Sequence, residues 1–285
     1  MIKIGKQIIG DKTFPNNEVI IDKVNDCVNM HLSLNAFDEI NVFMRYDSDS
    51  DIVKLIFIKK HLDDNFTGLR VRLSMPYIPY SRMDRKINGF CFTLKYFCDI
   101  INSLNFDSVS VLDSHSNVST ALLNNCVEFK PLPYIEKAIN FIKSKNQKID
   151  YIFYPDNGAY KRYVDMSQDF DSSIYDIPSF FGNKLRNLQT GDIIDYQLIN
   201  SPNLKGKNVL IIDDLCSKGF TFYNAGLKLK ESGVDNLYLY VTHCEESIYR
   251  GKLLSSNLFN KIFTTNSILT NWESDVLYKV LDVLK

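Results

Sequence analysis

The sequence of 285 residues lacks a long apolar run, an excess of charge of either sign and any low-complexity tract. Its formal net charge is −1, which excludes a global basic field of the kind that holds nucleic acid or an anionic membrane. No apolar run approaches the length of a membrane span, and the first ten residues, MIKIGKQIIG, lack the apolar core of a signal peptide. We therefore expect a cytoplasmic protein that binds neither nucleic acid nor a membrane.

Several familiar catalytic patterns are absent as well. The six cysteines include no Cys-x-x-Cys pair, so we expect reduced thiols. No Walker A motif and no Ser-His-Asp or Cys-His arrangement is present. Hydrophobic residues make up 45% of the chain and charged residues 24%, which is ordinary for a globular protein. The length suits two compact domains or one large domain.

The stretch Asn208–Thr221, NVLIIDDLCSKGFT, is the most informative part of the sequence. A β-branched apolar run predicts a buried parallel strand over residues 209–212 that ends on Asp213 and Asp214. A short loop and a helix from Thr221 follow, so the backbone N–H groups of the loop and of the helix N-terminus can bind phosphate. The two carboxylates are suited to accept hydrogen bonds from vicinal ribose hydroxyls. The alternative is a solvated Asp-Asp turn, with Cys216 a small filler residue.

Strands and helices alternate along the rest of the chain, which favours an α/β fold with parallel sheets. The predicted strands cover residues 18–22, 39–45, 69–75, 108–112, 151–154, 179–181, 193–199, 237–242 and 262–264. The predicted helices cover residues 52–62, 93–104, the segment up to Asp165, 221–232 and 275–284.

Two segments of the first half carry candidate functional residues. The run MPYIPYSRMDRK ends in the charge cluster Arg82, Asp84, Arg85 and Lys86, which is either a solvated loop or a polyphosphate clamp. The segment DSHS follows a predicted strand and places His115 at its carboxyl end, as a structural residue or as a metal or phosphate ligand.

Seven segments, in order along nearly the whole chain, resemble motifs of one family. PYIPYSRMDRK is similar to Pro-Tyr-x-x-Tyr-x-Arg-Gln-Asp-Arg-Lys, with Met83 in place of Gln, and FPNNE is similar to Phe-x-Asp-Gly-Glu, with Asn16 and Asn17 in place of Asp-Gly. VLDSHS, YPDNGAYKR, NKLR, THC and TTNSI resemble further family segments. The family is that of the ribose-phosphate diphosphokinases, or PRPP synthetases.

The loop after the acidic pair also resembles the PRPP-binding loop of type I phosphoribosyltransferases. Asp213, Asp214 and Thr221 match the family pattern. Ser217 stands where the pattern has a third acid, and Lys218-Gly219-Phe220 replaces Thr-small-Gly. The phosphate-binding half of the motif is therefore altered.

The resemblance implies an α/β fold of two phosphoribosyltransferase-like (flavodoxin-like) domains with mostly parallel sheets and the active site between them. We expect an ATP-side domain over residues 1–132 and a ribose-phosphate-side domain over residues 133–285, whose last helix packs on the first domain. The resemblance also implies Mg²⁺, ATP as co-substrate, and a homo-oligomer, a dimer or hexamer, with the adenine site shared between subunits.

The resemblance assigns roles residue by residue. The implied catalytic residues are Lys184, Arg186 and His115. The implied ATP-binding residues are Phe14, Asn16, Glu18, Arg82, Met83, Asp84 and His115. The implied ribose-phosphate-binding residues are Asp213, Asp214, Ser217, Lys218, Gly219, Phe220 and Thr221. The implied metal ligands are His115 and Asp156.

The expected reaction transfers the β,γ-diphosphoryl group of ATP to the anomeric hydroxyl of a ribose 5-phosphate-type acceptor, with release of AMP. The acceptor is either ribose 5-phosphate, giving PRPP, or a 5′-extended ribose such as ADP-ribose, whose product would lead into NAD synthesis. The alternatives are a type I phosphoribosyltransferase and a non-catalytic PRPP-synthetase-associated protein.

Overall fold

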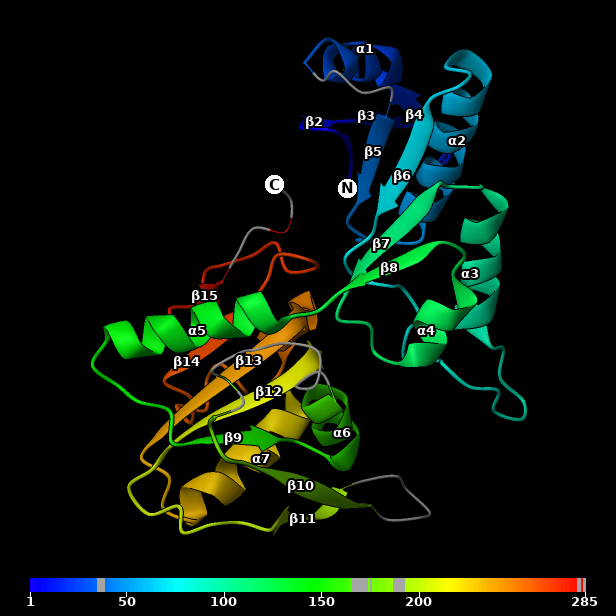
Figure 1. Cartoon of the computed structure of the whole chain (residues 1–285). Coiled ribbons are helices and arrows are strands. Elements are labelled where there is room, and N and C mark those ends of the chain that lie inside the picture. The colour runs from blue at the N-terminus through cyan, green and yellow to red at the C-terminus, as the bar shows by residue number, and fades with distance from the viewer. Residues whose placement is uncertain (35–38, 166–173, 175, 187–192, 281–282, 284–285) are drawn as a thin grey trace. The chain divides into compact units, whose positions relative to one another are not determined.

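The computed structural model describes the chain except residues 35–38, 166–173, 175, 187–192, 281–282 and 284–285. The chain divides into two compact units (Figure 1), which we call unit 1, Met1–Phe129, and unit 2, Lys130–Val283. Each unit contains a largely parallel sheet with helices packed on it. The predicted α/β fold with two sheet domains is therefore confirmed.

Unit 1 contains a six-stranded sheet in the order β2-β1-β5-β6-β7-β8. The strands are β1 Ile2–Ile4, β2 Gln7–Ile8, β5 Glu39–Met44, β6 Arg70–Ser74, β7 Ser108–Leu112 and β8 Cys126–Phe129. The run β5-β6-β7-β8 is parallel, whereas β1 and β2 add antiparallel at one edge. A separate antiparallel hairpin is formed by β3 Gly10–Thr13 and β4 Val19–Asp22.

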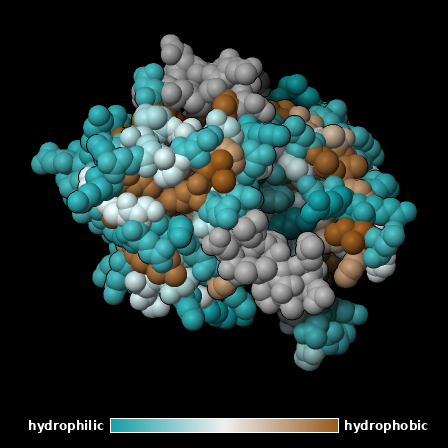
Figure 2. Space-filling view, turned by 90° about the horizontal axis from the view of Figure 1, so that it is seen from below, coloured by the Kyte–Doolittle hydropathy of each residue, from teal (hydrophilic) through white to brown (hydrophobic). Residues whose placement is uncertain are grey.

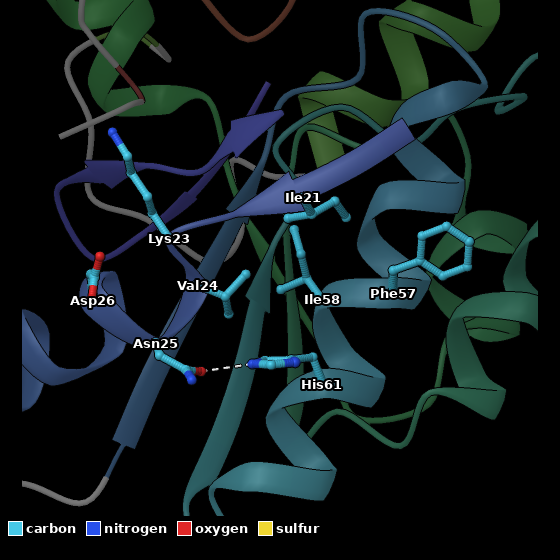
Figure 3. A pocket seen from close by; sticks show the side chains of 8 residues that line it. All are labelled: Ile21, Lys23, Val24, Asn25, Asp26, Phe57, Ile58 and His61. Carbon is cyan, nitrogen blue, oxygen red and sulfur yellow. Dashed lines mark hydrogen bonds between the residues drawn. The ribbon is translucent and has the colours of Figure 1, made fainter. Parts of the chain in front are cut away.

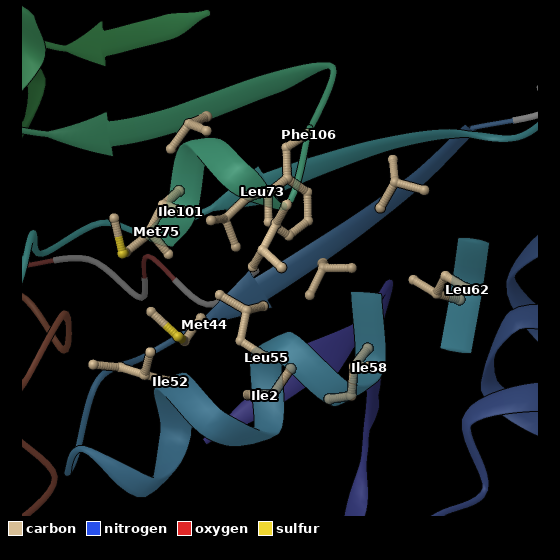
Figure 4. Close-up of a cluster of buried hydrophobic side chains, with 14 of the residues drawn as sticks. Ile2, Met44, Ile52, Leu55, Ile58, Leu62, Leu73, Met75, Ile101 and Phe106 are labelled. Carbon is tan, nitrogen blue, oxygen red and sulfur yellow. The ribbon is translucent and has the colours of Figure 1, made fainter. Parts of the chain in front are cut away.

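The helices of unit 1 are α1 Val24–Leu34, α2 Ser50–Asn65, α3 Thr93–Ser103 and α4 Asn117–Leu122. On α2, residues Ile52, Leu55, Ile58 and Leu62 recur every three or four positions and are buried, as expected for the core-facing stripe of an amphipathic helix. Figure 4 shows this stripe with sheet residues such as Leu73 in one hydrophobic cluster.

Unit 2 contains a seven-stranded sheet in the order β11-β10-β9-β12-β13-β14-β15. The strands are β9 Tyr151–Tyr154, β10 Ser179–Arg186, β11 Ile193–Ile199, β12 Asn208–Cys216, β13 Asn236–Cys244, β14 Lys261–Thr264 and β15 Leu277–Lys279. All neighbours are parallel except β10 and β11. The helices are α5 Leu132–Ser144, α6 Asn157–Asp165, α7 Phe220–Glu231 and the short 3₁₀ helix η2 Glu246–Arg250.

Helices cover both faces of this sheet, because alternate residues of its central strands belong to two different clusters. Leu210 and Ile212 of β12 pack with residues of α5 and α6. Val209 and Ile211 of the same strand pack with residues of α7. A strand that is buried on both faces reads as a continuous apolar run, which is the pattern that predicted it.

Three sequence expectations need correction. The organising strand does not end at the acidic pair, because Leu215 and Cys216 continue the register with His243 and Cys244 of β13. The strand predicted over 179–181 continues through Arg186 as β10. The helix predicted over 275–284 is wrong, since Leu277–Lys279 pair in parallel with β14. Pairing at the sheet edge overrides a helical spacing of valines.

The face drawn in Figure 2 is mostly hydrophilic, with apolar residues in separate areas. Among the residues that the structure describes, no helix is long and apolar enough to cross a membrane.

Candidate active site

The acidic pair of β12 is held by an arginine that the sequence analysis did not select. Arg162 Nη2, from α6, donates to Asp213 Oδ1 at 3.1 Å and to Asp214 Oδ1 at 2.8 Å. The side chains of Asp213 and Asp214 are 15% and 5% exposed, so the solvated-turn alternative does not describe them. Arg162 follows Lys161 directly, and nothing in the sequence separates the half-buried cation from its exposed neighbour.

Two further groups belong to the same cluster. Asp156 precedes the first residue of α6, and its Oδ1 accepts a hydrogen bond from the backbone N–H of Ala159 at 3.0 Å, as a helix N-cap does. The buried Tyr196 hydroxyl of β11 donates to the carbonyl oxygen of Pro155 at 2.6 Å. Burial raises the pKa of Tyr196, and the charges of Asp156 and Asp213 raise it further.

The cluster carries more negative than positive charge. Burial raises the pKa of Asp213 well above its usual value, and the neighbouring Asp214 carboxylate raises it further. The Arg162 guanidinium opposes both effects, and Asp156 adds to them. Buried groups with opposed charge effects of this kind are typical of functional sites.

The loop after β12 leads directly into α7. Gly219 is its left-handed residue, with φ +75°, and precedes the first helical residue, Phe220. The Phe220 side chain is 60% exposed, and Lys218 is exposed as well. Because Gly219 supplies the conformation that L side chains rarely adopt, Phe220 occupies an ordinary helical position.

Cys216 lies on β12 just before this loop, opposite Cys244 of β13. A hydrogen bond that the Cys216 thiol makes with Cys244, together with burial, raises the pKa of Cys216, which disfavours the reactive thiolate. The structure therefore supports the filler role.

The predicted catalytic cations lie on β10. Lys184 pairs with Tyr196 and Arg186 with Ile193 of β11, with an irregularity between Leu185 and Arg186. The strand next to β10 on the other side is β9, which leads to Asp156.

In unit 1, the candidate residues follow two adjacent parallel strands. The loop that contains Arg82, Met83 and Asp84 follows β6, and His115 lies in the loop between β7 and α4. Since β6 and β7 are parallel neighbours, both loops leave the same edge of the sheet.

Tyr80 anchors the loop that contains Arg82. Its backbone is left-handed, with φ 62°, and its hydroxyl donates to Asp49, which also accepts from Tyr46 at 2.5 Å. The ring lies against Phe97 of α3, with centroids 5.6 Å apart. Arg82 itself is exposed.

The segment FPNNE forms the exposed turn between β3 and β4. Asn16 Oδ1 accepts from the backbone N–H of Glu18 at 3.2 Å, and Asn17 is left-handed, with φ 67°. Asparagine favours both arrangements, as Asp-Gly does, so the substitutions keep the turn. Phe14 is 48% exposed at its start.

A pocket in unit 1 lies apart from all these candidates. It is lined by residues of β4, α1 and α2, among them Phe57, and by Lys23 between β4 and α1. One wall carries a 2.7 Å hydrogen bond between His61 and Asn25 (Figure 3). None of the sequence-predicted site residues lines it.

No group of three or more His, Cys, Asp or Glu that could hold a metal ion is found among the described residues. A dedicated metal cage is therefore not part of what the structure describes, and the ligands predicted at His115 and Asp156 stay a prediction.

The comparisons with known proteins find ribose-phosphate pyrophosphokinases by sequence and a phosphoribosylpyrophosphate synthetase by structure. The chain is 27% identical over 226 residues to the ribose-phosphate pyrophosphokinase of Sulfolobus acidocaldarius, which covers 77% of this chain and 72% of that protein. It is 26% identical over 226 residues to the protein of the same name from Sulfurisphaera tokodaii, with the same coverage. The phosphoribosylpyrophosphate synthetase structure from Mycobacterium smegmatis matches with a TM-score of 0.75 and 18% identity, over 97% of this chain and 86% of that one. No family model matches.

The two sheets and the acidic end of β12 define an α/β protein built from two phosphoribosyltransferase-like units. Within that class, the chain is similar in sequence to ribose-phosphate pyrophosphokinases and in fold to a phosphoribosylpyrophosphate synthetase.

Proposed function

We propose that the protein is an ATP-dependent diphosphokinase that transfers the β,γ-diphosphoryl group of ATP to the anomeric hydroxyl of a ribose 5-phosphate-type acceptor. The observation that carries the proposal is the cluster of Asp156, Asp213 and Asp214 beside a loop that enters α7. The similarity to ribose-phosphate pyrophosphokinases supports the same reading.

In this reaction the oxygen of the C1 hydroxyl attacks the β-phosphorus, the bond between the β-phosphorus and the α,β-bridging oxygen breaks, and AMP leaves. Phosphoryl transfer requires mainly positioning and charge neutralisation. Asp213 and Asp214 would accept hydrogen bonds from the ribose hydroxyls, with Arg162 fixing the orientation of both carboxylates. Lys184 and Arg186 would stabilise the charge that develops on the transferred oxygens.

Mg²⁺ fits this set of residues as a partner of phosphate oxygens rather than as an ion in a protein cage. Mg²⁺ is usually bound through one or two carboxylates plus substrate phosphates. Carboxylates exceed cations in the cluster: burial raises the pKa of Asp213, and the neighbouring Asp214 and Asp156 carboxylates raise it further. Asp156 is the ligand that we propose in unit 2, and His115 is the ligand that we propose in unit 1. The ion would neutralise phosphate charge when bound.

We also propose a homo-oligomer in the cytoplasm whose adenine site is completed by the hairpin tip of a neighbouring subunit. The hairpin supports this assignment, because Phe14, Asn16 and Glu18 are all exposed in unit 1.

The test of the reaction is product analysis by phosphorus NMR with ATP, Mg²⁺ and a panel of ribose phosphates. We expect AMP and a 1-diphosphate to form together, to stop with EDTA and to return with Mg²⁺ or Mn²⁺, since triphosphates and oxygen ligands favour hard cations. A phosphoribosyltransferase would instead consume PRPP without ATP, and a non-catalytic relative would form no product. Activity with Zn²⁺ alone would contradict the proposed metal.

Three features of the loop favour a 5′-extended acceptor such as ADP-ribose. Phe220 offers an exposed ring on which a base can stack, a contact that contributes about 1–3 kcal/mol in nucleic-acid complexes. Lys218 adds an exposed cation, and Ser217 has no charge where the family loop has an acid. The alternative is ribose 5-phosphate as acceptor, with a loop that has drifted in sequence.

The ratio of kcat/KM for ADP-ribose to that for ribose 5-phosphate decides between the two acceptors. We expect the wild type to prefer ADP-ribose and Phe220→Gly to lower the ratio about tenfold or more, as loss of one stacked base predicts. A wild-type preference for ribose 5-phosphate that the substitution leaves unchanged would exclude the extended acceptor.

A further inference from the structure

The acceptor loop lacks one acid, and a neighbouring strand brings a carboxylate to the same place. Ser217 occupies the position of the third loop acid. β12 and β13 are paired in parallel up to Cys216 and Cys244. Ser217 is therefore the residue that follows β12, and Glu245 is the residue that follows β13. The backbone N–H of Glu245 donates to the carbonyl oxygen of Cys216 at 2.8 Å, which continues this alignment beyond the strands.

The Glu245 carboxylate is held by two hydroxyls. Ser217 Oγ donates to Glu245 Oε2 at 2.7 Å, and Ser247 Oγ donates to the same oxygen at 2.9 Å. Ser247 is 8% exposed, and its Oγ lies 3.0 Å from that of Ser217. Hydrogen bonds to an ionised acceptor are about twice as strong as those between neutral groups, so this arrangement fixes both the carboxylate and the loop hydroxyl.

The rest of the loop rests on the same segment of chain. A Cβ on Gly251 would collide with the carbonyl oxygen of Lys218, and a Cβ on Gly219 would lie 2.7 Å from Leu253. The loop is therefore packed against the segment that begins with Glu245 and continues through η2 to Leu253. A substitution of Glu245 therefore leaves the packing of the loop backbone at Lys218 and Gly219 in place and changes only the contact with Ser217 and Ser247.

We propose that Glu245 is a positioning residue of the acceptor loop, and that from its place directly after β13 it replaces the acid that is missing at position 217. This inference rests on the proposed function. The carboxylate keeps a negative charge beside the loop, and it engages the Ser217 hydroxyl, which is then not a donor for the acceptor phosphate. The missing acid is thus compensated in space, and selectivity for an extended acceptor rests on Lys218 and Phe220 alone.

A charge-relocation experiment tests the proposal. Glu245→Gln keeps the shape but removes the charge, and Ser217→Asp places a second carboxylate within hydrogen-bond distance of the first. We expect each single variant to raise KM for ribose 5-phosphate, or for ADP-ribose if that is the better acceptor, about tenfold, with KM for ATP unchanged. The double variant Ser217→Asp with Glu245→Gln moves the acid back into the loop and should return KM to within about threefold of the wild type. Such non-additivity is expected only of residues in contact.

Glu246→Gln is the matched control. Glu246 is the next residue, but its carboxylate accepts from the backbone N–H groups of Thr270 and Asn271, at 2.7 and 3.1 Å. This control should lower the melting temperature without changing acceptor KM. If Ser217→Asp does not fold, Ser217→Ala replaces it, and Ser217→Ala with Glu245→Gln should then be no worse than either single variant.

Two outcomes would overturn the proposal. One is a wild-type acceptor KM for Glu245→Gln, and the other is a double variant whose rise in KM is the product of the rises in the two single variants. Failure of the proposed function has a different signature, namely no diphosphoryl transfer by the wild type. In that case the same cycle is measured on calorimetric binding of ribose 5-phosphate and on the melting temperature. Non-additive effects of the substitutions at positions 217 and 245 would still support the replacement of the missing acid by Glu245, and additive effects would still exclude it.

Discussion

Asp213→Asn should make the protein more stable at neutral pH while weakening acceptor binding. Asparagine keeps the oxygen that accepts from Arg162 and from the backbone N–H of Asp214, so the hydrogen bonds of the site survive. It removes the repulsion that a buried carboxylate experiences beside Asp214. Acceptor binding should fall about 10- to 100-fold, since a hydrogen bond to a charged group contributes about 1.5–3 kcal/mol.

The stability gain should depend on pH in a defined direction. The folded-state pKa of Asp213 is raised, so the protonated form favours the folded state and this contribution is lost as pH rises through the raised pKa. The wild type is therefore penalised at neutral pH and not in acid. The difference in unfolding free energy between Asp213→Asn and the wild type should be largest at neutral pH and shrink as the pH falls.

Urea unfolding across pH and calorimetric titration with ribose 5-phosphate and ADP-ribose measure the two effects. Asp213→Asn with Asp214→Asn should abolish acceptor binding in a folded protein. It also leaves Arg162 without a carboxylate partner in this pair, so it should be less stable than the single variant. Unfolding of the single variant at neutral pH would mean that the carboxylates are structural, and the assignment of the ribose site would fail.

Lys184→Ala should lower turnover by about 10²–10³-fold, which is typical for removal of one preorganised group that stabilises developing charge. ATP binding and the melting temperature should change little, because the interaction belongs to the transition state. Lys184 pairs with Tyr196 in the β10–β11 ladder, and the alanine variant keeps the backbone groups that make such pairs. Single-turnover kinetics separate the chemical step from ATP binding.

Lys207→Ala is the matched control for this lysine. Lys207 directly precedes β12, at the end of the strand opposite Asp213, and its ammonium group lies 3.6 Å from Asp150. Its loss should leave turnover unchanged. Near-normal turnover of Lys184→Ala would mean that NKLR does not supply the catalytic cations.

Local patterns predicted much of the fold correctly. The strands β7, β9 and β11 have the bounds that the apolar runs indicate, and α3 begins at Thr93 as the spacing of Leu94, Phe97 and Ile101 predicts. These patterns succeed because the spacing of apolar side chains alone determines which stripe of a helix or which run of a strand can be buried. The local pattern gives the wrong prediction for the C-terminal segment. Leu277 belongs to an edge strand that pairs with β14, and β14 lies too far away in the sequence for a local pattern to include it.

The sequence by itself determined the α/β fold and the buried apolar strand that carries the acidic pair, because both depend on neighbours within a few residues, although the strand continues two residues beyond the pair. Only the tertiary structure decided which groups surround that pair. Arg162 lies 51 residues from Asp213, and Glu245 lies 28 residues from Ser217. Parallel strands bring such residues together at one sheet edge, and no local pattern records the pairing. The acid missing from the loop in the sequence is therefore present beside the loop in space.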